Sequence, residues 1–192
     1  WRNNFLYSAA SISQEVVASI ADPKRLPLII GIDCHMNETN RYADYFIPDR
    51  SMLEEYAADR MWGSHMLGVV AAAPLVTPRT IKNAAGQHVC MEQLLVDIAL
   101  DMQLAGFGQG AIAHEDGTKA DLLCFEDWHA KYLANVAAQC ENLPTVTAED
   151  RHWAGLEYAM KTLTPRLNVN EAAEVEALLS RGGYYVADER YD

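Results

Sequence analysis

Asp33, Cys34 and His35 stand together at the end of an apolar segment formed by residues 28–32. A carboxylate that follows a buried strand can accept two hydrogen bonds from a ribose diol or from the N1 and N2 edge of guanine. The same carboxylate can instead cap a short helix over residues 34–37. From the residues alone, these two roles for Asp33 are equally well supported.

Cys34 and His35 raise two further hypotheses, a metal site and a cysteine–histidine nucleophile pair. Adjacent residues on an extended chain point in opposite directions, so one metal ion would hardly reach both side chains. A nucleophile pair needs oxyanion partners, which nothing in the sequence marks. The six histidines and four cysteines also lack the H-x-x-x-H, H-E-x-x-H and C-x-x-C spacings of metal sites. We therefore expect no metal site and no complete set of catalytic residues.

Two other motifs have plain structural interpretations. The adjacent acids Glu54 and Glu55 would diverge on a helix or a strand, which favours a solvated segment over paired acid–base catalysts. The glycines at 106, 108 and 110 follow a predicted helix, whereas a phosphate-binding loop follows a strand and opens a helix. We expect them to end the helix and open a long loop through residue 117.

The elements that must position Asp33 follow from apolar periodicity and from helix-capping residues. Ser13 can cap a helix that Asp22 and Pro23 end. Residues 28–32 form a strand apolar on both faces, which suits a parallel sheet covered by helices. A short helix within residues 38–44 and a second strand at 45–47 should follow.

The rest of the chain predicts one more strand and several helices. Residues 67–72 form the strand, and the last third of the chain is helical. Thr147 and Asp150 form a capping box for one of its helices. Asn170 caps another helix, which ends at Gly182. Two earlier helices should each present one apolar stripe, made by Met91, Leu94, Leu95, Ile98 and Met102 and by Trp128, Tyr132, Leu133 and Val136. The expected fold class is α/β, a Rossmann-like parallel sheet with flanking helices.

Composition excludes two classes of partner. The chain has 192 residues, 22% of them charged, and a net charge of −12, and nucleic-acid binding needs clustered Lys and Arg instead. The longest apolar run, residues 67–76, is interrupted by Pro74 and is too short for a membrane-spanning helix of about 20 residues. We expect no nucleic-acid partner and no direct membrane insertion.

The segment IDCHMNETNRYADYFIPD, which begins at Ile32, resembles a stretch of the molybdopterin oxidoreductases, the catalytic subunits of the dimethyl sulfoxide reductase superfamily. The family has an apolar strand ending in Asp, followed at fixed spacing by Glu-Thr, Ala-Asp and Pro. This chain matches with Asp33, Glu38, Thr39, Ala43, Asp44 and Pro48. Stretches at 1–9, 105–117, 130–137 and 178–185 resemble the tetrathionate reductase branch, with respiratory arsenate and other sulfur-oxyanion or polysulfide reductases as alternatives.

The resemblance implies an enzyme that holds molybdenum on two molybdopterin guanine dinucleotides and receives electrons through a [4Fe–4S] centre. Its reaction would be reduction of tetrathionate to thiosulfate in anaerobic respiration. Its expected partners are an iron–sulfur electron-transfer subunit and a membrane anchor subunit, and its expected location is the periplasm. The family's cysteine cluster, molybdenum ligand and C-terminal barrel are missing here. We therefore expect an internal piece that is inactive alone and binds no cofactor alone.

The resemblance also assigns parts of the chain to the cofactor. Residues 1–125 would belong to the middle, cofactor-contacting α/β domain, and 126–192 would be its helical extension. Ile32 and Asp33 match the strand-end pair that meets the guanine dinucleotide, and Glu38 and Thr39 follow in the same motif. Glu55 is a candidate contact at a position where the family often has Lys, so an acid there removes a phosphate partner.

Two functions of other classes stay open. One is a non-catalytic docking domain, which would expose a large apolar patch and lack a guanine-sized pocket at Asp33. The other is a small free-standing enzyme that uses Asp33, Cys34 and His35, which would require turnover by this chain alone.

Overall fold

The computed structural model describes residues 4, 6, 13–60, 67–113, 117–140 and 142–186. These residues form helices, a two-stranded parallel sheet, and antiparallel sheets, so the predicted α/β class is confirmed. The chain divides into two compact units. Unit 1 comprises Trp1–Ser51 and Arg79–Leu94, and unit 2 comprises Met52–Pro78 and Leu95–Asp192.

Unit 1 contains the elements that carry Asp33. They are α2 (Gln14–Ile20), β1 (Ile30–Asp33), the 3-10 helix η1 (Asn40–Tyr42) and β2 (Tyr45–Pro48). Ser13 caps α2 as predicted, because its side chain accepts from the backbone N–H of Val16. Strands β1 and β2 are parallel, with Asp33 opposite Pro48. The predicted order of helix, strand, short helix and strand is confirmed.

Strand β1 is buried on both faces only at its end, and not along its whole length as we expected. Gly31, Ile32 and Asp33 are buried, but Ile30 is 50% exposed and Leu28, which precedes the strand, is 57% exposed. Helix α2 buries none of its residues. An apolar run shows that a strand can be buried on both faces, but burial also requires a covering element.

The short helix η1 packs closely on β1 at Gly31. A Cβ atom at this position would lie 2.7 Å from Asn40 Oδ1 and 3.2 Å from Ala43 Cβ. Both distances are shorter than ordinary contact, so only glycine fits without a shift. This close packing fixes the loop that leads from Asp33 back to β2.

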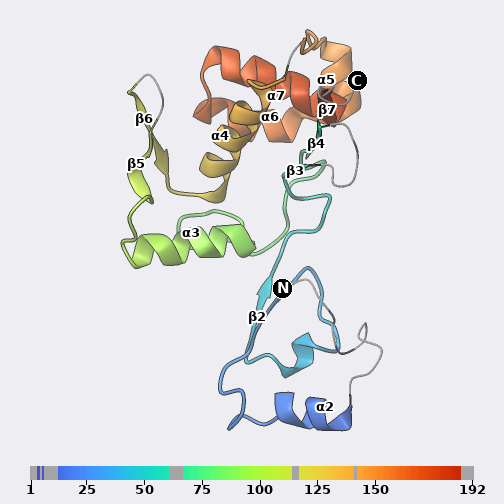
Figure 1. Cartoon of the computed structure of the whole chain (residues 1–192), viewed down its shortest axis with the longest axis vertical. Coiled ribbons are helices and arrows are strands. Elements are labelled where there is room, and N and C mark those ends of the chain that lie inside the picture. Colours follow the sequence, from blue (N-terminus) through green and yellow to red (C-terminus); the bar gives the residue numbers. More distant parts are fainter. Residues whose placement is uncertain are drawn as a thin grey trace. The chain divides into compact units, whose positions relative to one another are not determined.

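Unit 2 contains the helical last third, as predicted. Its antiparallel sheet has the order β3-β4-β7, and Figure 1 shows β4 and β7 beside the helices. The elements are β3 (Ala57–Arg60), β4 (Leu67–Ala72), α4 (Phe125–Ala137), α5 (Ala148–Ala154), α6 (Glu157–Leu163), η2 (Thr164–Arg166), α7 (Val169–Arg181) and β7 (Gly183–Val186). The helices enclose an apolar core that includes Leu133, Leu156, Leu163, Val175 and Leu178.

The predicted glycine-rich loop is wrong over most of its length. Gly108–Ala113 forms β5, which pairs antiparallel with β6 (Lys119–Leu122). Gly110 adopts a φ of 61°, and its N–H donates to Asp121 Oδ1 at 2.8 Å. Glycine thus allows an irregular strand here. Residues 114–116 of the expected loop lie outside the described residues.

Helix α3 (Met91–Asp101) exists as predicted, but its predicted buried face is wrong. Leu95, Ile98 and Met102 are 52%, 44% and 64% exposed, whereas Gln93, Val96 and Ala99 are buried. This sequence has apolar residues on more than one side of the helix, so periodicity alone cannot select the buried side.

The predicted apolar stripe of α4 is also only partly correct. Leu133 is buried, but Trp128 is 47% exposed and stacks on Tyr132 with ring centroids 5.0 Å apart. The buried side of the helix consists of Phe125, Glu126, His129, Ala130, Leu133, Ala134 and Ala137. Small alanines allow close helix packing, which a search for large apolar residues overlooks.

The capping box of Thr147 and Asp150 is confirmed at α5. The predicted Asn170 cap is wrong, because Asn168 caps α7 together with Glu171. Across the described residues, no helix has both the length and the apolar character needed to cross a bilayer.

Candidate functional site

The Asp33 carboxylate ends β1 and is only 4% exposed. Its Oδ1 accepts from the Cys34 backbone N–H at 2.7 Å and from the Cys34 thiol at 3.4 Å. Its Oδ2 accepts from Asn37 Nδ2 at 2.9 Å. Hydrogen bonds to both oxygens fix the plane of the carboxylate.

The alternative role of Asp33, as the cap of a helix at 34–37, is wrong, because no helix forms there. Residues 34 and 35 form a bend, and 36 and 37 are irregular. The Asn37 side chain closes this turn instead, because its amide donates to Asp33 while its Oδ1 accepts from the Asn40 backbone N–H at 2.9 Å. Asn37 therefore links the end of β1 to the start of η1.

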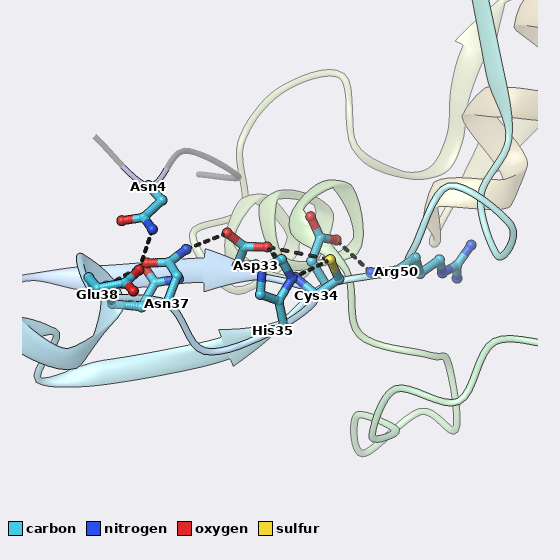
Figure 2. Close-up of polar contacts among 9 residues, drawn as sticks. Asn4, Asp33, Cys34, His35, Asn37, Glu38 and Arg50 are labelled. Atoms are coloured by element: carbon cyan, nitrogen blue, oxygen red, sulfur yellow. Dashed lines mark hydrogen bonds and ion pairs between the residues drawn. The ribbon is translucent and has the colours of Figure 1, made fainter. Parts of the chain in front are cut away.

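The bend also overturns our expectation that Cys34 and His35 point apart. Cys34 Sγ lies 3.2 Å from His35 Nδ1, and that ring nitrogen lies 3.7 Å from Asp33 Oδ1. Figure 2 shows Asn37 on one side of the Asp33 carboxylate and the Cys34 and His35 side chains on the other. The rule of alternating directions holds for extended strands, and the strand ends at Asp33.

Glu38 and Thr39 contact the first residues of the chain. The Glu38 carboxylate accepts from Asn4 Nδ2, and Thr39 Oγ1 donates to Asn4 Oδ1 at 2.9 Å and accepts from the Leu6 N–H at 3.1 Å. A hydrogen bond from its own backbone N–H, followed by the one from Asn4, lowers the pKa of Glu38 below its ordinary value. Glu38 is exposed, so its carboxylate is also open to solvent.

The remaining two predicted residues have different environments. Ile32 is buried at 8% exposure and pairs with Ile47 across the β1–β2 ladder, so it supports the strand from within the core. Glu55 is half-buried and belongs to unit 2, whereas the other four predicted residues belong to unit 1.

Sequence reasoning missed Asp49 and Arg50, which directly follow β2, beside the end of β1 at Asp33. They are 3% and 2% exposed. The Asp49 N–H donates to the Asp33 carbonyl at 2.9 Å, while its Oδ1 accepts from the Arg50 N–H and from the Met91 N–H, at 3.0 and 3.1 Å. Arg50 Nη2 donates to the His88 carbonyl at 3.3 Å. The available signal was the same one used for Asp33, an acid directly after a strand.

The donor and acceptor pattern limits how a nucleoside could meet Asp33. A carboxylate oxygen can accept about two hydrogen bonds. Oδ1 already accepts two from Cys34, whereas Oδ2 accepts one from Asn37. Among the described residues Oδ2 thus accepts fewer hydrogen bonds than Oδ1, so a base or ribose donor would have to approach that atom.

Three known proteins match almost the whole chain. The tetrathionate reductase A subunit of Salmonella typhimurium is 31% identical over 189 residues, which cover 97% of this chain. The tetrathionate reductase A subunit of Archaeoglobus fulgidus is 30% identical over 92% of the chain, and the selenate reductase A subunit of Mesobacillus selenatarsenatis is 28% identical over 91%. The predicted resemblance to this group of catalytic subunits is confirmed.

The chain spans only about 18% of the length of these relatives. Each relative is an oxidoreductase catalytic subunit, and this chain matches one part of it. No family model matches the chain, and no solved structure matches it.

Proposed function

We propose that this chain is part of a molybdenum-bis(molybdopterin guanine dinucleotide) oxidoreductase that reduces tetrathionate to thiosulfate in anaerobic respiration. The observation that carries the proposal is the 31% identity to a tetrathionate reductase catalytic subunit over 97% of the chain. Selenate reduction is the second candidate, because a selenate reductase catalytic subunit matches at 28% identity. The proposal extends to a [4Fe–4S] centre, an iron–sulfur electron-transfer subunit, a membrane anchor subunit and a periplasmic location.

Within this enzyme, the end of β1 would help to anchor one guanosine end of the cofactor. The buried carboxylate of Asp33 is held in one orientation by Cys34 and Asn37, so little ordering is needed when a donor arrives. The N1 and N2 groups of guanine and the hydroxyls of ribose are such donors. Glu38 and Thr39, next to this turn, are candidate additional contacts, and Ile32 keeps the strand end in place.

The molybdenum centre supplies the two-electron chemistry when the cofactor is bound. The contribution of these residues is binding and orientation. We propose that residues 1–125 belong to the cofactor-contacting α/β domain and that residues 126–192 extend it. Glu55 is the weakest of the proposed contacts, since its negative charge opposes a phosphate.

Guanosine anchoring can be tested by titrating the purified chain with GMP and following backbone amide shifts by NMR. We expect shifts concentrated at residues 31–40 even if binding is only millimolar. They should be lost in Asp33→Asn, which keeps the shape but replaces one acceptor oxygen by a donor. Glu15→Gln on α2 removes one exposed acid of the same unit and should leave the shifts unchanged. Equal responses in both variants would refute an Asp33 site.

The substrate can be tested on the complete enzyme that contains this chain. We expect a higher kcat/KM for tetrathionate than for selenate, because two of the three relatives are tetrathionate reductase subunits. The opposite order would favour the second candidate.

A further inference from the structure

The Asp33, Cys34 and His35 side chains form a cluster that the guanosine proposal does not use. Their ligand atoms Oδ1, Sγ and Nδ1 lie within 4.8 Å of one another. The three separations are 3.4 Å from sulfur to oxygen, 3.2 Å from sulfur to nitrogen and 3.7 Å from nitrogen to oxygen. Figure 2 shows all three side chains gathered at the end of β1.

These separations are close to the distances between neighbouring ligand atoms around one metal ion. Zinc binds Cys, His and carboxylate ligands at about 2.0–2.3 Å, so neighbouring ligands at tetrahedral angles lie about 3.3–3.7 Å apart. The separations from oxygen to sulfur and from oxygen to nitrogen fall within this range, and the 3.2 Å between sulfur and nitrogen is slightly shorter. An ion could therefore enter with small rotations of the exposed Cys34 and His35 side chains.

We infer that the end of β1 is a binding site for a borderline-soft divalent metal ion such as Zn²⁺, held by Asp33 Oδ1, Cys34 Sγ and His35 Nδ1. Thiolate and imidazole ligands select zinc-like ions over Mg²⁺ and Ca²⁺, which prefer oxygen ligands. Three protein ligands leave a fourth position for water or another ligand.

The charges of the cluster favour such an ion. The Cys34 thiol lies within hydrogen-bond distance of Asp33 Oδ1. A Cys ligand binds a metal ion as the thiolate, so a divalent cation would neutralise the negative charges of both ligands. The Asn37 amide on Oδ2 holds the carboxylate in place from the other side, as outer-shell partners of metal ligands do.

The site differs from the proposed guanosine contact in the atoms that it uses. The metal ion would take Oδ1, whereas a base or ribose donor would approach Oδ2, which accepts one hydrogen bond among the described residues. The inference does not depend on the proposed function.

Co²⁺ is the spectroscopic probe for this site. We would titrate the purified, reduced chain with Co²⁺ and record the near-ultraviolet sulfur-to-cobalt charge-transfer band. We expect one ion per chain, release of protons on binding, and loss of the band when Zn²⁺ displaces Co²⁺. Cys34→Ala should abolish the band. His35→Ala should weaken binding at least about 10–100-fold, since removal of an outer-shell partner already costs that much.

Matched controls come from unit 2. His152 Nδ1 lies 3.7 Å from Glu157 Oε1, and the imidazole is 79% exposed, close to the 73% of His35. His152→Ala should therefore leave Co²⁺ binding unchanged, as should Cys140→Ala, whose thiol donates to the Val136 carbonyl.

Two results would overturn the inference. One is the absence of a charge-transfer band at millimolar Co²⁺ in the folded chain, with folding checked by circular dichroism. The other is a band that survives in Cys34→Ala. The GMP titration is repeated on Cys34→Ala, which lacks the thiol but keeps the backbone N–H that donates to Asp33. If this variant loses the cobalt band but keeps the GMP response, the metal site and the guanosine site are tested separately.

Discussion

The Asp33 carboxylate shows at the scale of single residues how a strand end becomes a binding site. The backbone turns immediately after β1, and this turn places a backbone N–H, a thiol and an amide around two oxygens. The same turn brings the Cys34 thiol to the His35 imidazole. One bend therefore creates both the oriented acceptor and the metal-ligand triangle.

A second cysteine, Cys124, is buried at the start of α4, whereas Cys34 is exposed. Burial penalises its thiolate and raises its pKa from 9.0 to about 11, although the hydrogen bond from Arg166 acts in the opposite direction. A thiol with this pKa is protonated at neutral pH and a poor nucleophile.

We predict that Cys124 makes the folded chain less stable in alkaline solution. The unfolded thiol ionises near pH 9.0 and the folded one near 11, so the stabilisation is complete below 9.0 and is lost as the pH rises towards 11. Urea unfolding across this window should show a steeper loss of unfolding free energy in the natural sequence than in Cys124→Ala. Parallel curves for the two proteins would contradict the prediction.

At the scale of elements, the start of α7 depends on a side chain outside the helix. Asn168 Oδ1 accepts from the Glu171 N–H at 2.8 Å, and Glu171 Oε2 accepts from the Asn168 N–H at 2.9 Å. Lys131 of α4 also donates to both Glu171 carboxylate oxygens, at 3.1 and 2.8 Å. Glu171 therefore takes part both in the cap of α7 and in the contact between α4 and α7.

We predict that Asn168→Ala lowers the unfolding free energy of the chain by about 1 kcal/mol, the usual cost of losing an N-cap. The matched control is Asn170→Ala, two residues later. Asn170 is exposed in the first turn of the same helix, and alanine has the higher helix propensity, so this variant should show no loss. Urea unfolding followed by circular dichroism compares the two, and equal losses would contradict the assignment of the cap.

At the scale of the whole molecule, the two units differ in their apolar cores. In the described residues, the buried apolar side chains of unit 1 are Ile32 and Cys90, whereas unit 2 buries many large ones, including Leu133, Leu163 and Leu178. Apolar burial is the main source of folding stability. Unit 1 should therefore open at a lower free energy than unit 2.

Native-state hydrogen exchange can measure this difference for each amide. We predict greater protection in α4 and α7 than in β1 and β2. Leu178→Ala should lower the protection free energy of α4 and α7 amides by about 2–5 kcal/mol. Protection at the β1–β2 ladder should not change. An equal fall in both units would show that the chain unfolds as one cooperative body.

Sequence alone determined the features that depend on neighbouring residues. The capping box of Thr147 and Asp150, the strand at 67–72 and the position of Asp33 at a strand end all follow from local spacing. Their physical basis is short-range, since a cap needs only a side chain three residues from a backbone N–H. The resemblance to the reductase subunits likewise rests on residues at fixed spacing along the chain.

Only the tertiary structure decided which surfaces are buried and which side chains meet. The apolar residues of α3 permit several buried faces, and in the folded chain the buried face is that of Gln93, Val96 and Ala99. The glycines after α3 permit a loop or a strand, and pairing with Lys119–Leu122 selects the strand. Cys34 and His35 come together because β1 ends at Asp33. Burial and pairing depend on partners far away in the sequence, which local periodicity does not specify.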